Sequence, residues 1–200
     1  MASVRETGDR LYTLPPAAFT AARDAAVGEA RQAGDRATAT ELAGLKRPTQ
    51  AAWLVNLLAL SRPELVEELI ELGAAIRSAQ GSVPPTQLRD LSARRRKALD
   101  AALATSQELA RGADAAAPTR ALLDEVEGTL AAAMADEAAA GTVRSGRVLK
   151  PLRYSGFGDG LVATTTTVPR TSGPRGRRRH APRHRAHRST PARRNPRMKS

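Results

Sequence analysis

Apolar residues recur along this chain with the period of an α-helix, and Gly and Pro divide the pattern into separate segments. In the clearest segment, Ser61 and Glu64 stand at the spacing of a capping box, which starts a helix. The apolar residues that follow at i, i+4, i+7 and i+11 are Leu65, Leu69, Leu72 and Ile76. This spacing places them on one face of a helix, and the pattern ends at Gly81.

The whole pattern predicts an all-α fold, a small helical bundle of about five helices within residues 1–140. The segments with helical spacing are 16–34, 36–45, 49–60, 63–80, 86–111 and 118–140. The segment 49–60 is apolar nearly all round, so we expect it to be the most buried element. Leu11–Leu14 is expected to be extended, because Pro15 and Pro16 disfavour helix in the residue before each.

The pattern changes at Gly141, which is expected to end the last helix. Residues 141–169 are richer in Gly and β-branched residues, so we expect a loop or short strand and then a Thr-rich linker. Gly156-Phe-Gly158-Asp-Gly160 lacks the spacing and the strand–loop–helix context of a nucleotide-binding loop, and we interpret it as a turn. Residues 170–200 contain no acidic residue and few apolar ones, so we expect a disordered tail.

The net charge of +12 is concentrated in this tail. Residues 170–200 contain eleven Arg and one Lys, whereas the basic and acidic residues of 1–169 balance, with 20 of each. Arg binds phosphate through paired hydrogen bonds and keeps its charge, so the tail predicts non-specific binding of DNA or RNA. The expected phosphate-binding residues are Arg175, Arg177, Arg178, Arg179, Arg183, Arg185, Arg188, Arg193 and Arg194.

Other interpretations of the tail stay open. A solvated basic tail binds polyanions in vitro without any biological role, and a GC-rich gene translated out of frame gives a similar composition. An anionic membrane surface is less favoured, because no apolar amphipathic face accompanies the charge. His180, His184 and His187 have helical spacing, but Pro182 and the surrounding Arg disfavour a bound cation. We therefore expect no metal and no cofactor.

Two stretches, Leu11-Tyr-Thr-Leu-Pro15 and Leu45-Lys-Arg-Pro-Thr-Gln-Ala-Ala-Trp53-Leu-Val-Asn56, carry a resemblance to a known family. The chain resembles an uncharacterised family of high-GC Gram-positive (actinobacterial) proteins, which has an LYxLP lead-in and an LKRPTQAAWLVN-type box. Gly146–Gly158 is similar to a recurring element of that family. The resemblance implies a helical intracellular protein without an established activity. It also implies an Ala/Glu/Arg-rich helical continuation, from which the basic tail departs.

Trp53 and Asn56 stand about one helical turn apart in this box. In the favoured interpretation Trp53 fills the core and Asn56 makes one buried interhelical hydrogen bond. The alternative is a partner groove or an anion site at the helix start, beside Lys46 and Arg47. The cluster Arg94-Arg95-Arg96-Lys97 points around a whole helix, so we expect a solvated, Glu-paired surface rather than one binding face.

Together these features predict a non-catalytic, cytoplasmic helical interaction protein whose tail binds nucleic acid. Residues 1–169 contain neither Cys nor His, so nucleophilic or general acid–base catalysis has no obvious agents. No apolar segment approaches the roughly 20 residues of a membrane span. The alternative is a protein-interaction or scaffold protein with an incidental or frameshift-derived tail. In that case the apolar stripes 65–76 and 122–134 pair with a partner helix, so their exposure favours the alternative and their burial disfavours it.

Overall fold

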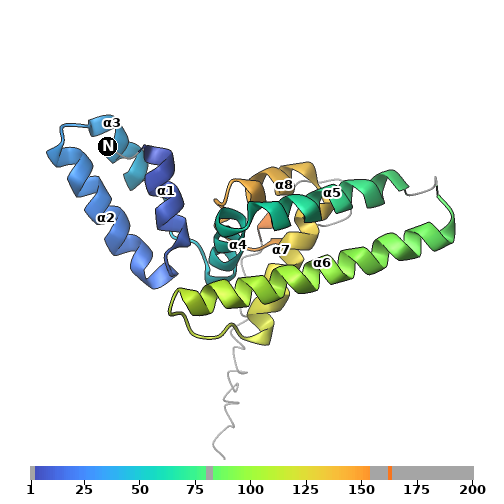
Figure 1. Ribbon diagram of the computed structural model, residues 1–200. Coiled ribbons are helices and arrows are strands. Elements are labelled where there is room, and N and C mark those ends of the chain that lie inside the picture. Colours follow the sequence, from blue (N-terminus) through green and yellow to red (C-terminus); the bar gives the residue numbers. More distant parts are fainter. Residues whose placement is uncertain (1–2, 80–82, 154–161, 164–200) are drawn as a thin grey trace, which may run out of the picture. The chain divides into compact units, whose positions relative to one another are not determined.

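The computed structural model describes residues 3–79, 83–153 and 162–163 of the chain. Within these residues the chain forms eight α-helices and one pair of very short strands (Figure 1). The helices are α1 (Val4–Thr13), α2 (Pro16–Gln32), α3 (Arg36–Ala43), α4 (Gln50–Ser61), α5 (Pro63–Ala79), α6 (Pro85–Gly112), α7 (Arg120–Ala135) and α8 (Glu137–Arg144). Strand β1 (Leu152–Arg153) pairs antiparallel with β2 (Val162–Ala163). The described residues confirm a mainly helical fold, but the expected number of about five helices is wrong.

The first additional helix is α1, where the sequence predicted an extended lead-in. Ser3 and Glu6 form a capping box: the Glu6 amide donates to Ser3 Oγ at 3.1 Å, and the Ser3 amide donates to Glu6 Oε2 at 2.8 Å. Pro15 restricts only the residue before it, and Leu14 is extended with φ −73° and ψ 144°. The prediction failed because it extended the influence of the two prolines over Leu11–Leu14.

The second additional helix arises because the predicted helix 118–140 breaks at Asp136. Asp136 has extended backbone angles of φ −138° and ψ 133°, and its carboxylate accepts a 2.8 Å hydrogen bond from the Ala139 amide. It therefore ends α7 and caps the start of α8. Gly141 was expected to end the last helix, but it lies inside α8, which continues to Arg144.

The main core is built around α4, which is buried all round as its apolar pattern predicted. Trp53, Leu54 and Leu58 have almost no exposed surface. Helices α5, α6, α7 and α8 pack against α4 and complete this core (Figure 1). Val143 and Val148 also belong to it and are fully buried. Residues on both sides of Gly141 thus contribute to one core.

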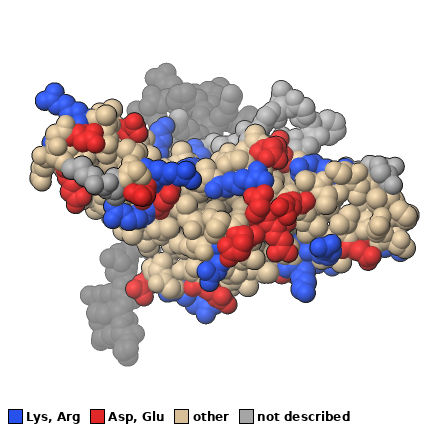
Figure 2. Space-filling model, turned by 45° about the horizontal axis from the view of Figure 1, so that its top comes forward, with Lys and Arg blue, Asp and Glu red and all other residues tan. Residues whose placement is uncertain are grey.

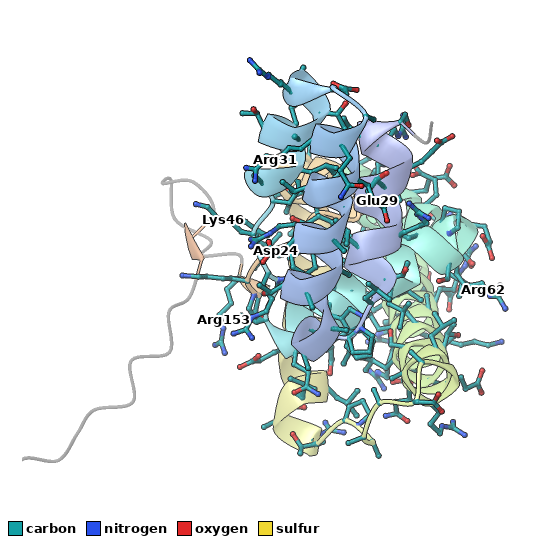
Figure 3. All side chains as sticks on the ribbon, turned by 90° about the vertical axis from the view of Figure 1, so that its left-hand side faces the viewer. Asp24, Glu29, Arg31, Lys46, Arg62 and Arg153 are labelled. Atoms are coloured by element: carbon teal, nitrogen blue, oxygen red, sulfur yellow. The ribbon has the colours of Figure 1, made fainter. Side chains whose placement is uncertain are left out.

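A second apolar cluster lies among α1, α2 and α3. Phe19 is fully buried there, and its ring lies 5.2 Å from that of Tyr12 at an angle of 54°. The outer side of α2 carries exposed polar residues, including Asp24, Glu29 and Arg31 (Figure 3). Because α1 also contacts α4, it connects this cluster to the main core.

Two side chains of α4 tie distant parts of the chain to it. The indole of Trp53 donates a 3.0 Å hydrogen bond to the carbonyl of Thr13, at the end of α1. Asn56 is fully buried, and its amide nitrogen donates to the Val148 carbonyl at 2.9 Å while its amide oxygen accepts from the Val148 amide at 2.8 Å. The predicted buried hydrogen bond of Asn56 therefore has a loop backbone as its partner rather than another helix.

Close packing of α5 on α7 depends on Gly73. A Cβ at this position would collide with the backbone of Met134, at both its carbonyl oxygen and its Cα. Arg77, one turn later on α5, donates a hydrogen bond to the same carbonyl. The two helices thus approach at a point where only hydrogen fits on α5.

We expect Asn56→Leu to lower the free energy of unfolding by about 2–5 kcal/mol, because it leaves the buried N–H and C=O of Val148 without partners. The measurement is chemical denaturation followed by circular dichroism. Gln50→Leu, an exposed substitution at the start of α4, is the control and is expected to change stability little. Equal stability of Asn56→Leu and the parent would contradict the assigned hydrogen bonds.

We expect Gly73→Ala to lower the free energy of unfolding by about 1–3 kcal/mol, because the added methyl group separates α5 from α7. Gly28→Ala on α2 is the matched control, since among the described residues no heavy atom outside the adjacent backbone of α2 lies within 4 Å of the added Cβ. That change is expected to raise stability by roughly 0.5–1 kcal/mol, as Ala favours helix over Gly. Thermal and urea unfolding measure the change in stability of both variants. If both variants gain or both lose stability, the packing argument is refuted.

Candidate functional site

A groove of about 470 Å³ runs between α5 and α6, which pack side by side (Figure 1). Its apolar lining comes equally from the two helices: Leu65, Leu72 and Ala75 on α5, and Leu91, Ala98 and Ala101 on α6. On each helix these residues stand at i, i+7 and i+10, which keeps them on one face. The groove is therefore formed by two apolar stripes with the same spacing.

Charged residues line the same groove, and each helix contributes one sign. Glu68 and Glu71 come from α5, and Arg94 and Lys97 come from α6. All four are exposed, and among the described residues none of them forms an ion pair or a side-chain hydrogen bond. Figure 2 shows acidic side chains gathered in the middle of one face, with basic side chains beside them. The groove thus combines an apolar floor with one acidic and one basic edge.

As the sequence predicted, the four side chains of Arg94–Lys97 do not form one surface. Arg94 and Lys97 line the groove with α5, whereas Arg95 lies in a depression beside Asp124 on α7. Arg96 lies in a third place, next to Leu88. The expected pairing with Glu is not present among the described residues, although all four basic residues are exposed.

The first half of α6 is unusually poor in buried surface. No residue from Pro85 to Ala98 is buried, and burial begins at Leu99. Leu88 is 37% exposed, and it is one of two large apolar side chains with this much exposure among the described residues. In Figure 1 this half of α6 extends beside α5, away from α7. About 14 residues at the start of α6 therefore gain little cover from the rest of the described chain.

The two stripes proposed as partner surfaces are mostly buried within the chain, which disfavours the alternative in which they pair with a partner helix. Leu69 and Leu72 of the stripe 65–76 are buried, as are Val126, Leu130 and Met134 of the stripe 122–134. Leu65 and Ile76 are only partly buried, at the edge of the main core. What remains available is the groove edge of α5. The sequence pointed to Arg94 and Lys97 on α6 as part of a basic cluster, but it did not relate them to α5.

The start of α4, the alternative anion site, is already capped. Thr49 Oγ1 accepts a 3.3 Å hydrogen bond from the Ala52 amide. Lys46 and Arg47 are exposed, and the Lys46 carbonyl accepts a 3.1 Å hydrogen bond from the Tyr12 hydroxyl. In Figure 3 the side chains of Lys46 and Arg153 extend outward from the loop and from β1. Trp53 and Asn56 lie in the core rather than at a surface site.

Arg147 joins α1 to the loop that follows α8. Its guanidinium lies 4.9 Å from the centre of the Tyr12 ring and forms a 2.7 Å ion pair with Asp9. Burial raises the pKa of Tyr12, and the positive charge of Arg147 partly opposes this increase. Gly8 leaves room for the guanidinium, because a Cβ at this position would collide with it. These contacts stabilise the fold and leave no free functional group.

Arg144 on α8 is paired with two carboxylates, Glu67 on α5 and Glu137 on α8, each at 2.7 Å. The hydrogen bonds from Arg144 hold the pKa of Glu67 below its ordinary value of 4.5. The same partners raise the pKa of Arg144. Glu67 is thus occupied on the α8 side of α5, whereas Glu68 and Glu71 face the groove.

The remaining predicted sites lie outside the described residues. This holds for the nine phosphate-binding Arg of the tail (Arg175, Arg177, Arg178, Arg179, Arg183, Arg185, Arg188, Arg193 and Arg194), for the three His, and for the turn Gly156–Gly160. Within residues 3–79, 83–153 and 162–163, no group of three or more Asp, Glu, His or Cys side chains is placed to hold a metal ion. None of the described helices combines the length and the apolar character needed to cross a membrane.

Comparison with known proteins found no match. No protein-family model matches the chain, and neither a curated protein nor a solved structure shows significant similarity to it.

We expect the Glu67 carboxylate to titrate below pH 4.5, because Arg144 stabilises its charged form. The stability from this pair is fully present above the ordinary pKa and is lost as the pH falls through the lowered one. In Arg144→Met the Glu67 midpoint is expected to rise, measured by NMR of the side-chain carboxyl carbon. Arg111→Met, at the exposed end of α6, is the control and should leave it unchanged. An unchanged midpoint in Arg144→Met contradicts the pairing.

Proposed function

We propose that this chain is a non-catalytic helical interaction protein whose Arg-rich tail, residues 170–200, binds nucleic acid through its phosphates. The observation that carries the proposal is the separation of charge along the sequence. All of the net charge of +12 stands in the tail, while the rest of the chain is balanced. A polyanion is therefore attracted to the tail and has little net attraction to the helical body.

The composition of the tail supports contact with phosphate rather than with bases. Eleven of its cations are Arg, whose planar guanidinium binds two phosphate oxygens at once. The tail contains no aromatic residue on which bases would stack. Binding is therefore expected to be insensitive to sequence and strongly weakened by salt.

The groove between α5 and α6 supports a second role, in which the helical body binds a protein. Its apolar floor and its two charged edges are features of helix-binding surfaces. If the tail is incidental, this role alone remains, and the protein is a scaffold or protein-interaction module. The two roles depend on different residues, so each is tested without the other.

The tail is tested in the full chain by changing its nine central Arg to Gln: Arg175, Arg177, Arg178, Arg179, Arg183, Arg185, Arg188, Arg193 and Arg194. We expect the parent to bind duplex DNA. If half of the tail cations engage phosphates, a plot of log K against log salt concentration should have a slope of about −5. The Gln variant keeps three of the twelve cations and is expected to lose about three quarters of this slope. Fluorescence anisotropy of labelled DNA and RNA from low to physiological salt measures both.

Two controls separate charge from other effects. The same nine positions changed to Lys retain the charge, so the salt slope should persist with somewhat weaker affinity. A body variant with Arg95 and Arg96 changed to Gln should bind like the parent. Undiminished binding by the nine-Gln variant would refute the role of the tail, and loss of binding in the body variant would move the site to α6.

A further inference from the structure

We propose that the groove between α5 and α6 binds the same groove of a second copy of this chain, forming a two-fold symmetric dimer with a four-helix centre. The inference rests on the proposed role of the groove as an interaction surface and names its occupant. It is independent of the tail. Three features of the described residues support it: the spacing of the apolar floor, the order of the charges, and the exposed half of α6.

The floor of the groove has the spacing of helices that pack against further helices. Leu65 and Leu72 on α5, like Leu91 and Ala98 on α6, are separated by seven residues, the repeat of apolar seams in helical bundles. Ala75 and Ala101 follow three residues later on their helices and leave room for close approach. A pair of helices with the same stripe therefore fits the groove, and the chain itself provides such a pair.

The charges make the groove complementary to itself. On α5 the acidic Glu68 and Glu71 follow Leu65 by three and six residues. On α6 the basic Arg94 and Lys97 follow Leu91 by the same intervals. A second groove rotated by 180° about an axis parallel to the helices places its α5 over α6 of the first. Each acidic edge then faces a basic edge, and both sets of pairs form at once.

The same charges oppose the other symmetric arrangement. A two-fold axis across the helices would place α5 on α5 and α6 on α6, so that like charges face each other. Occupants of a single sign are also disfavoured. A nucleic acid meets the carboxylates of Glu68 and Glu71, and a basic peptide meets Arg94 and Lys97. A second copy supplies both signs in the required order.

The exposed half of α6 gains cover in this arrangement. Residues 85–98 contain no buried side chain, and two helices alone bury little apolar surface. Two such hairpins packed together form four helices around a shared apolar centre, as in helical bundles. A dimer also carries two basic tails, which strengthens binding to a long polyanion through a higher effective concentration.

The test uses charge reversal in the full chain, without nucleic acid. The acidic-edge variant carries Glu68→Lys and Glu71→Lys, and the basic-edge variant carries Arg94→Glu and Lys97→Glu. Each places like charges across the dimer, so each is expected to dimerise at least about tenfold more weakly than the parent. Mixed in equal amounts, the two variants are expected to form a heterodimer, because every edge then again faces its opposite.

Sedimentation equilibrium over a range of concentrations measures the dimer, and circular dichroism verifies that each variant is helical. Arg95→Glu with Arg96→Glu is the matched control, since these residues change the charge of α6 by the same amount outside the groove; it should dimerise like the parent. Rescue in the mixture also shows that both variants fold.

A parent that remains monomeric overturns the proposal, and so does a dimer that neither reversal weakens or that the mixture fails to restore. Whether the tail binds nucleic acid at all does not depend on these outcomes, and the tail variants test it separately. Conversely, a tail without affinity for DNA or RNA leaves the dimer measurement unchanged. The two proposals therefore fail independently.

Discussion

The fold depends on how the buried stretch 51–59 of α4 satisfies the side-chain amide of Asn56. Helix α4 is covered on every side, so Asn56 has no access to water. Its amide pairs with both backbone groups of Val148 and thereby fixes the loop after α8 on the core. An unpaired amide in this position would cost more than a lost apolar contact. Two further hydrogen bonds hold the same segment: the Thr49 amide donates to the Leu149 carbonyl at 3.0 Å, and the Leu152 amide donates to Thr129 Oγ1 at 3.1 Å.

The same helix determines how the N-terminal helices are attached. Trp53 reaches from α4 to the end of α1, and Tyr12 of α1 reaches the loop before α4. Arg147, held one residue after the glycine at Gly146, lies over Tyr12 and pairs with Asp9. Gly146 has a positive φ of 62° and lies against Leu60, so a larger residue there would be strained and crowded. Packing against α4, two hydrogen bonds, an ion pair and a cation–π contact thus join α1 to the main core.

Sequence reasoning succeeded where a periodic pattern and a local stop signal agreed. The stretch 49–60 was expected to be the most buried because it is apolar all round, and α4 is. Reasoning failed where a short polar residue outweighed the pattern: Ser3 starts α1 and Asp136 divides α7 from α8. Such caps act through one or two hydrogen bonds, which periodicity does not detect. The S-x-x-E spacing of Ser3 and Glu6 was visible but was not used.

The candidate groove lay beyond sequence reasoning for a different reason. Glu68 and Arg94 each belong to an ordinary amphipathic helix, and only the packing of α5 on α6 brings them to one groove. These residues give the groove charges of both signs, whereas the tail carries only positive charge. A tail of one sign attracts any polyanion and selects none. A groove with an acidic and a basic edge at matched spacing attracts little at long range, but it discriminates strongly between partners and orientations at contact. Selectivity in this chain is therefore expected to come from the helical body, and general affinity from the tail.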